Sequence, residues 1–166
     1  MITIASWEIS TNDSPFMDVS LSIYCSGCHR DCPGCQNSDL QDFKNGVYME
    51  SAAVVELVTA RISLIESVVF LGGDWIYYPT ELKEVSNQIK QINSSLDLIL
   101  YTGELFEVLP YNILDNLDII IDGPYLEHKK TNLQIPASSN QRVFIKENST
   151  FHEVVASTLP INKESS

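Results

Sequence analysis

The chain has 166 residues, of which 44% are hydrophobic, and this size and composition are those of one globular domain. Ten Lys and Arg residues against 22 Asp and Glu residues give a formal net charge of -12. Nucleic acid is therefore not expected as a partner, because its phosphates would be repelled. No apolar run approaches the roughly 20 residues that span a bilayer, and Met1 to Trp7 lack the features of a signal peptide. We expect a cytoplasmic protein that does not bind membranes.

The first half of the chain predicts two strands, a long loop and then a helix followed by a strand. Residues 2–9 and residues 18–24 alternate polar and apolar side chains, as half-buried strands do. Residues 25–46 are polar and rich in Gly, Asp and Asn, and a loop of this length inside a compact domain is usually functional. A helix capped by Ser51 is expected next, with apolar residues at helical spacing as far as residue 65. The apolar run 67–71 fits a buried strand.

The second half repeats this order of helix and strand. Apolar residues at helical spacing between positions 82 and 92 predict a helix, and the run 96–101 predicts a buried strand. A short helix is expected at 111–117, followed by a strand at 118–121. This alternation is typical of an α/β fold with a parallel sheet.

The length limits how far such a sheet can close. A complete barrel of eight units takes about 250 residues, so we predict an open, partial (βα) barrel of five to six mostly parallel strands. Residues 1–166 are expected to form a single domain, with 147–166 as a polar C-terminal tail or short helix. The spacing of Thr150 and Glu153 has the form of a capping box and favours the helix.

Loops of unusual composition follow the predicted parallel strands. They are the cysteine-containing loop that begins at residue 25 and the glycine-containing loops at 72–74, 102–103 and 122–123. Because the carboxyl ends of parallel strands meet at one edge of a sheet, these loops are expected to converge on one rim.

Four cysteines fall within eleven residues, at Cys25, Cys28, Cys32 and Cys35. In a reducing cytosol such crowding indicates metal rather than disulfides. The two C-x2-C pairs are separated by only three residues, which leaves little chain to wrap one zinc ion. The spacing C-x3-C-x2-C from Cys28 to Cys35 fits three thiolates on a [4Fe-4S] cluster with one iron left open. A four-thiolate zinc site and an ordinary electron carrier remain alternatives, and Cys25 is expected to be a buried thiol at a strand end.

The segment 28–37 resembles the cluster loop of radical S-adenosylmethionine (SAM) enzymes. Its ending is similar to that of the small activating proteins of anaerobic ribonucleotide reductase. Three further blocks agree with this family in order, namely 72–74, 101–103, and 122–125 followed by 138–142. One departure is Trp75, since many relatives have proline at this position.

The resemblance implies a radical SAM fold, a mechanism and a set of site residues. Cys28, Cys32 and Cys35 would hold a [4Fe-4S] cluster whose open iron is chelated by the amino and carboxylate groups of SAM. The reduced cluster would cleave SAM to methionine and a 5′-deoxyadenosyl radical, and in activases this radical takes a hydrogen atom from a glycine of a partner enzyme. By position, Gly34, Cys35 and Gln36 would lie along the adenosine and Gly73 and Asp74 would meet the amino group, with Asn37 and Gly72 as further cofactor-binding residues.

The expected partner is a glycyl radical enzyme, the large subunit of anaerobic ribonucleotide reductase, with a low-potential electron donor such as flavodoxin. The alternatives are an activase of a different glycyl radical enzyme, a radical SAM enzyme for a peptide or small molecule, and a zinc-stabilised module without catalysis. Catalysts for small substrates need extra chain to enclose the radical. We expect no segment of this chain to close the open flank of the sheet, which favours an activase.

Overall fold

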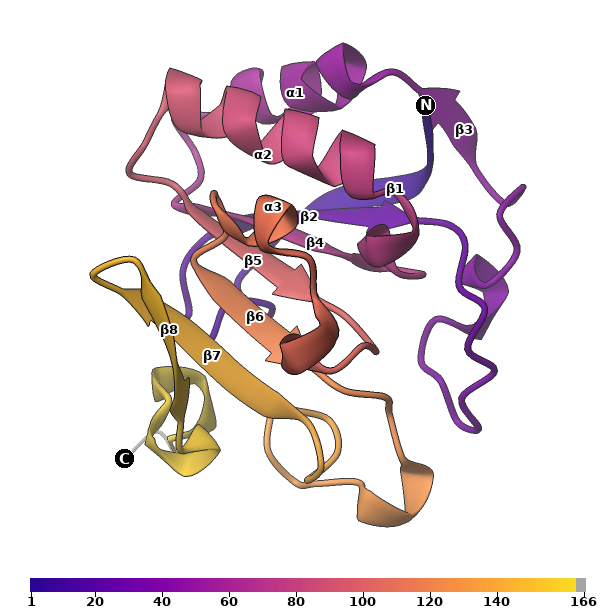
Figure 1. Ribbon diagram of the computed structural model, residues 1–166, viewed down its shortest axis with the longest axis vertical. Coiled ribbons are helices and arrows are strands. Elements are labelled where there is room, and N and C mark those ends of the chain that lie inside the picture. Colours follow the sequence, from indigo (N-terminus) through magenta and orange to yellow (C-terminus); the bar gives the residue numbers. More distant parts are fainter. Residues whose placement is uncertain (164–166) are drawn as a thin grey trace.

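The computed structural model describes residues 1–163 of the chain, and within them the backbone forms eight strands and three α-helices (Figure 1). The strands are β1 (Ile2–Ser10), β2 (Ser20–Cys25), β3 (Val47–Met49), β4 (Ser67–Gly72), β5 (Asp97–Tyr101), β6 (Ile119–Asp122), β7 (Arg142–Glu147) and β8 (Thr150–Val154). The helices are α1 (Ser51–Thr59), α2 (Pro79–Ile92) and α3 (Tyr111–Leu114). No helix within residues 1–163 is long and apolar enough to cross a membrane.

All eight strands belong to one mixed sheet with the order β3-β1-β2-β4-β5-β6-β7-β8. The pairs β2–β4, β4–β5 and β5–β6 are parallel, as predicted for the centre of the sheet. The pairs on both sides of this centre are antiparallel. The expectation of five to six mostly parallel strands was therefore wrong at the edges, where β1, β3, β7 and β8 add antiparallel partners without further crossover helices. The sheet is open, because β3 and β8 end it on opposite sides.

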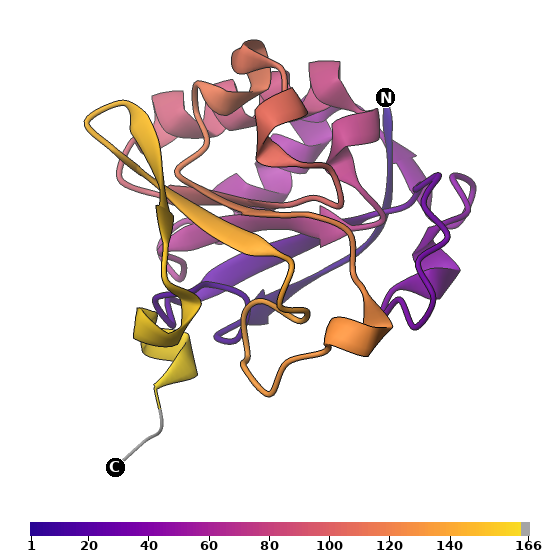
Figure 2. The same ribbon diagram turned by 60° about the horizontal axis from the view of Figure 1, so that its bottom comes forward.

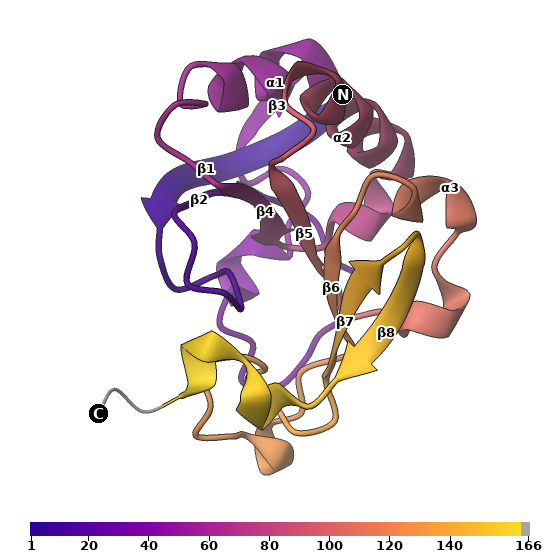
Figure 3. The ribbon, with the colours of Figure 1, turned by 90° about the vertical axis from the view of Figure 1, so that its left-hand side faces the viewer.

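The three helices cover one face of the sheet (Figure 1). Their buried apolar side chains pack on the strands in one large core, which includes Val54 and Val58 of α1 and Leu82, Val85 and Ile89 of α2. The opposite face carries no α-helix within the described residues. A smaller core lies there, and turns and irregular segments cover it (Figures 2 and 3).

The helices differ from the prediction in several places. α1 ends at Thr59 and not near residue 65, and α3 ends at Leu114 and not at residue 117. Ser51 does not cap α1, since Glu50 is the N-cap residue and the Ser51 hydroxyl instead donates to Glu84 of α2 at 2.6 Å. The predicted C-terminal helix at Thr150 was wrong, because Thr150–Val154 pairs with β7 as the edge strand β8. A Thr and a Glu three positions apart also occur in a half-exposed strand, and pairing with β7 decides between the two structures. The last three residues of the predicted tail, 164–166, lie outside the described residues.

The connection between β6 and β7, residues 123–141, crosses the face of the sheet that the helices leave free (Figure 2). Ile135 of this connection is buried with Leu159 against the sheet. The Asn162 side chain fixes it there, since its Oδ1 accepts hydrogen bonds from the backbone N–H groups of Gln134, at 3.0 Å, and Ile135, at 3.1 Å. The expectation that no segment covers this flank was therefore wrong.

Candidate functional site

A cavity of about 430 Å³ lies at the carboxyl ends of the parallel strands. The four predicted loops all contribute to its lining, which confirms their convergence on one rim. Most of the predicted site residues line it, namely Cys28, Cys32, Cys35, Gln36, Asn37, Gly72, Gly73 and Asp74. Gly34 is not among the lining residues. The far wall comes from residues 130–137 of the β6–β7 connection.

The cysteine loop is held by backbone hydrogen bonds between its two arms. The N–H groups of Gly27 and Cys28 donate to the carbonyl oxygens of Leu40 and Gln41 at 2.7 and 3.1 Å. A turn with a 3.0 Å bond from the Cys35 N–H to the Cys32 carbonyl brings the last two cysteines together. The three cysteines are partly exposed, and burial raises the pKa of the Cys28 thiol. The loop therefore presents three free thiols to one cavity.

Cys25 lies apart from the other cysteines. It is the last residue of β2, its exposed fraction is 0%, and it packs in the core on the helix side of the sheet. Burial raises the pKa of its thiol well above the ordinary value. Cys25 is thus a buried thiol at a strand end, as expected, and three of the four cysteines line the cavity.

This donor set fits an iron–sulfur cluster better than a single zinc ion. Within residues 1–163, no three Cys, His, Asp or Glu side chains are close enough together to share one metal ion. Three thiolates that bind separate irons of a cube lie farther apart than thiolates that share one tetrahedral ion. Three thiols line one cavity and the fourth cysteine is buried in the core, which matches the three-thiolate set expected from the C-x3-C-x2-C spacing.

Gly72 and Gly73 bring the end of β4 against the start of the cysteine loop. The Gly73 and Asp74 N–H groups donate to the carbonyl oxygens of Cys25, at 2.7 Å, and Gly27, at 2.9 Å. A side chain at Gly73 would collide with the backbone of Gly27, so these glycines permit close contact between two segments of the chain itself. Gly34 has a φ of 76°, and Glu127 occupies the space beside it.

Asp74 is the most enclosed polar residue of the site, with an exposed fraction of 1%. Its Oδ2 accepts hydrogen bonds from Arg30 Nη1 at 2.8 Å, Gly103 N at 2.9 Å and Thr102 Oγ1 at 3.0 Å, and its Oδ1 accepts one from Ile76 N at 3.1 Å. Burial raises the pKa of this carboxyl group, and the donors and the Arg30 charge oppose the increase. All four partners are donors, as an ionised carboxylate requires.

Trp75 fixes the backbone directly after this carboxylate. Its side chain is fully buried, and its indole N–H donates to the carbonyl oxygens of Ile23, at 3.2 Å, and Leu71, at 3.1 Å. The ring also packs edge-on against Phe70 at a centroid distance of 4.8 Å. This chain thus anchors the loop by burying an aromatic side chain against β2 and β4.

Sequence reasoning missed several residues that contribute to the site. Arg30 lies inside the cysteine loop and pairs with both Asp74 and Glu104. Asn12 and Asp13, from the connection between β1 and β2, line the cavity with the segment 130–137. Of these residues, only Arg30 could have been singled out from the sequence, because it is a cation between the cysteines of an acidic chain. The other segments have no spacing that distinguishes them from ordinary polar loops.

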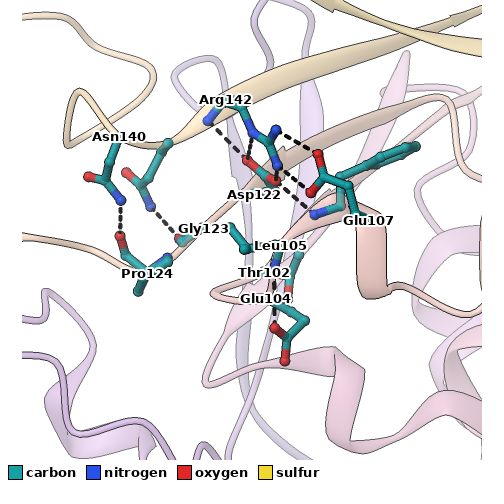
Figure 4. Close-up of polar contacts among 11 residues, drawn as sticks. Thr102, Glu104, Leu105, Glu107, Asp122, Gly123, Pro124, Asn140 and Arg142 are labelled. Carbon is teal, nitrogen blue, oxygen red and sulfur yellow. Dashed lines mark hydrogen bonds and ion pairs between the residues drawn. The ribbon is translucent and has the colours of Figure 1, made fainter.

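An ion-pair network holds the strand β6 and the loop after it (Figure 4). Arg142 of β7 pairs with Asp122 at 2.5 Å and with Glu107 at 2.7 Å. The hydrogen bonds from Arg142 lower the pKa of Glu107 to about 2. Asn140 Nδ2 donates to the Pro124 carbonyl at 2.8 Å and so fixes the start of the connection. The block 138–142 therefore has a structural role, which is to position the wall of the cavity.

Comparison with known proteins gives two results. The model of a family described as 4Fe-4S single cluster domain matches residues 18–144. Three relatives are each named anaerobic ribonucleoside-triphosphate reductase-activating protein. The one from Enterobacteria phage T4 is 31% identical over 127 residues, which are 74% of this chain and 81% of the relative. Those from Salmonella typhimurium and Escherichia coli K12 are each 25% identical over 133 residues, which cover 74% of this chain and 85% of each relative.

Proposed function

Since the chain belongs to the 4Fe-4S single cluster domain family and to the family of anaerobic ribonucleoside-triphosphate reductase-activating proteins, we propose that it generates a glycyl radical on an anaerobic ribonucleotide reductase. It is a radical SAM enzyme with a [4Fe-4S] cluster and SAM as its cofactors. The observation that carries the proposal is one cavity lined by three free thiols and by the residues predicted to bind SAM except Gly34.

The residues of the cavity have distinct roles in this proposal. Cys28, Cys32 and Cys35 would hold the cluster, which when bound supplies the electron that cleaves SAM. Asp74 would accept a hydrogen bond from the amino group of SAM. A hydrogen bond between a carboxylate and an amino or ammonium group is strong because at least one partner is charged. From their positions in the sequence motifs, further contacts with SAM are expected at Gly34, Gln36, Asn37, Gly72 and Gly73.

The cavity size supports a protein as the substrate. About 430 Å³ is near the lower end of the range for small-molecule sites, which is about 300–1,000 Å³. A cluster and SAM would leave little room for a further small molecule inside it. The glycine of the partner would therefore approach at the rim, between the cysteine loop and the β6–β7 connection, and would complete the exclusion of water there.

Three finer statements belong to the same proposal. The chain is a single radical SAM domain, and its open sheet corresponds to the partial barrel expected for that fold. The electron donor is a low-potential protein such as flavodoxin. The compartment is the cytoplasm, because four free cysteines and a reducible cluster suit a reducing environment.

The proposal predicts reductive cleavage of SAM. The cluster-loaded protein, reduced under anaerobic conditions, is expected to convert SAM to methionine and 5′-deoxyadenosine, and the yield should rise when an anaerobic ribonucleotide reductase is added. Chromatography of the products measures both amounts. A protein that holds a [4Fe-4S] cluster but releases no 5′-deoxyadenosine with or without the reductase would contradict the proposal.

A further inference from the structure

Arg30 links the cysteine loop to the ends of two strands. Its Nη1 donates to Asp74 after β4 and its Nη2 donates to Glu104 after β5, each at 2.8 Å. Its own backbone N–H lies beside the Cys28 sulfur. The side chain therefore reaches from the cysteine loop to the carboxylate expected to meet the amino group of SAM.

The surroundings of this side chain are shaped for an arginine. The Cδ and Nη1 atoms of Arg30 lie 2.9 Å from the position that a side-chain carbon on Gly103 would occupy, so any larger residue there would displace them. The Tyr77 ring lies 5.9 Å from the guanidinium carbon, and Gln41 Nε2 donates to the Arg30 carbonyl at 3.2 Å. The side chain is 21% exposed. Two separate segments, 74–77 and 103–104, thus surround the guanidinium, and Gln41 fixes the Arg30 backbone.

The two carboxylate partners of Arg30 differ in how readily they can be exchanged. Asp74 is fixed by three further donors and is almost completely buried. The Glu104 side chain is 40% exposed and does not line the cavity, whereas Arg30 does. An ion pair with an exposed partner contributes little to stability, because water and salt screen it. The exposed pair with Glu104 can therefore be lost while Arg30 keeps its bond to Asp74.

We propose that Arg30 recognises the carboxylate of the methionyl part of SAM. The inference rests on the proposed function. An amino group and a carboxylate on the same carbon need an acceptor and a donor side by side, and the Arg30–Asp74 pair supplies both. Guanidinium suits this role, because its planar donors match a carboxylate. Among the described residues that line the cavity, the other cationic side chain is Lys130, from the opposite wall.

Binding measurements on the cluster-loaded protein test this assignment. Anaerobic calorimetry would give the dissociation constants for SAM and for decarboxylated SAM, which keeps the sulfonium and the amine but lacks the carboxylate. For Arg30→Ala, we expect SAM affinity to fall about 10- to 100-fold and the affinity for the decarboxylated analogue to change much less. Arg30→Lys should retain part of the preference, and Glu104→Gln should bind SAM as tightly as the unaltered protein or more tightly.

The ratio of the two affinities separates recognition from damage to the loop. Removal of Arg30 takes a partner from Asp74 and can distort the site. Such distortion would lower the affinities for both ligands alike and leave their ratio unchanged. An unchanged ratio in both Arg30 variants would overturn the inference, as would loss of the preference in Lys130→Ala instead. If the unaltered protein binds and cleaves SAM while the Arg30 variants keep the ratio, only this inference fails. If the unaltered protein with its cluster binds no SAM, the proposed function fails as well.

Discussion

Replacement of Cys28, Cys32 or Cys35 by Ala is expected to abolish the cluster, whereas Cys25→Ala should leave it in place. The three residues line one cavity and would supply the three thiolates, so each variant would leave one iron without its protein ligand. Cys25 is fully buried in the core. Anaerobic reconstitution with iron and sulfide should load close to four irons on the unaltered protein and on Cys25→Ala, with the broad visible absorbance of such clusters.

Cys25→Ala is also the matched control for general damage to the fold. It removes a buried sulfur from the core and is expected to lower the free energy of unfolding by about 1 kcal/mol without affecting iron content. Loss of iron on changing Cys25, with the other three cysteines intact, would mean that a fourth thiolate binds the metal. The reading of the site as open to SAM would then be wrong.

Asp74→Ala is expected to affect both SAM binding and stability. The variant leaves Arg30, Thr102 and the Gly103 N–H without their shared acceptor. Removing one partner of a buried ion pair costs about 3–5 kcal/mol, and losing a hydrogen bond to a charged ligand group costs about 1.5–3 kcal/mol of binding. Chemical denaturation measures the first effect and anaerobic calorimetry with SAM the second.

Thr102→Val is the control for this experiment. It removes one donor to Asp74 and keeps the carboxylate, so its effect on the free energy of unfolding should be about 1 kcal/mol. Affinity for SAM that is the same in Asp74→Ala as in the unaltered protein would remove Asp74 from the site. A free energy of unfolding that does not change in Asp74→Ala would contradict the importance of its pair with Arg30.

The centre of the fold could be predicted from the sequence because its signals are local. The parallel strands β4, β5 and β6 are short apolar runs that end near glycine, and the fold places the residues after them at one rim. The spacing of the cysteines then identified which thiols face the cavity. These features depend on neighbouring residues in the chain, so no knowledge of distant contacts was needed.

The edges of the sheet and the far wall of the cavity depend on distant contacts. β8 is a partly exposed strand whose identity comes from pairing with β7. Ile135 and Leu159 lie in segments that have neither strand nor helix spacing, and only their contact beneath the sheet makes them core residues. The role of Arg30 depends on Asp74 and Glu104, which lie 44 and 74 positions away in the chain. The sequence of the cysteine loop alone does not indicate such distant partners.

Electron paramagnetic resonance of a mixture with anaerobic ribonucleotide reductase tests the central claim most directly. The reduced, cluster-loaded protein with SAM is expected to produce the doublet of a glycyl radical on the reductase. The signal should be absent with Cys28→Ala, Cys32→Ala or Cys35→Ala and present with Cys25→Ala. Cleavage of SAM without any radical on the reductase would contradict the assignment of this partner, and modification of a small molecule in the absence of any protein partner would contradict an activase altogether.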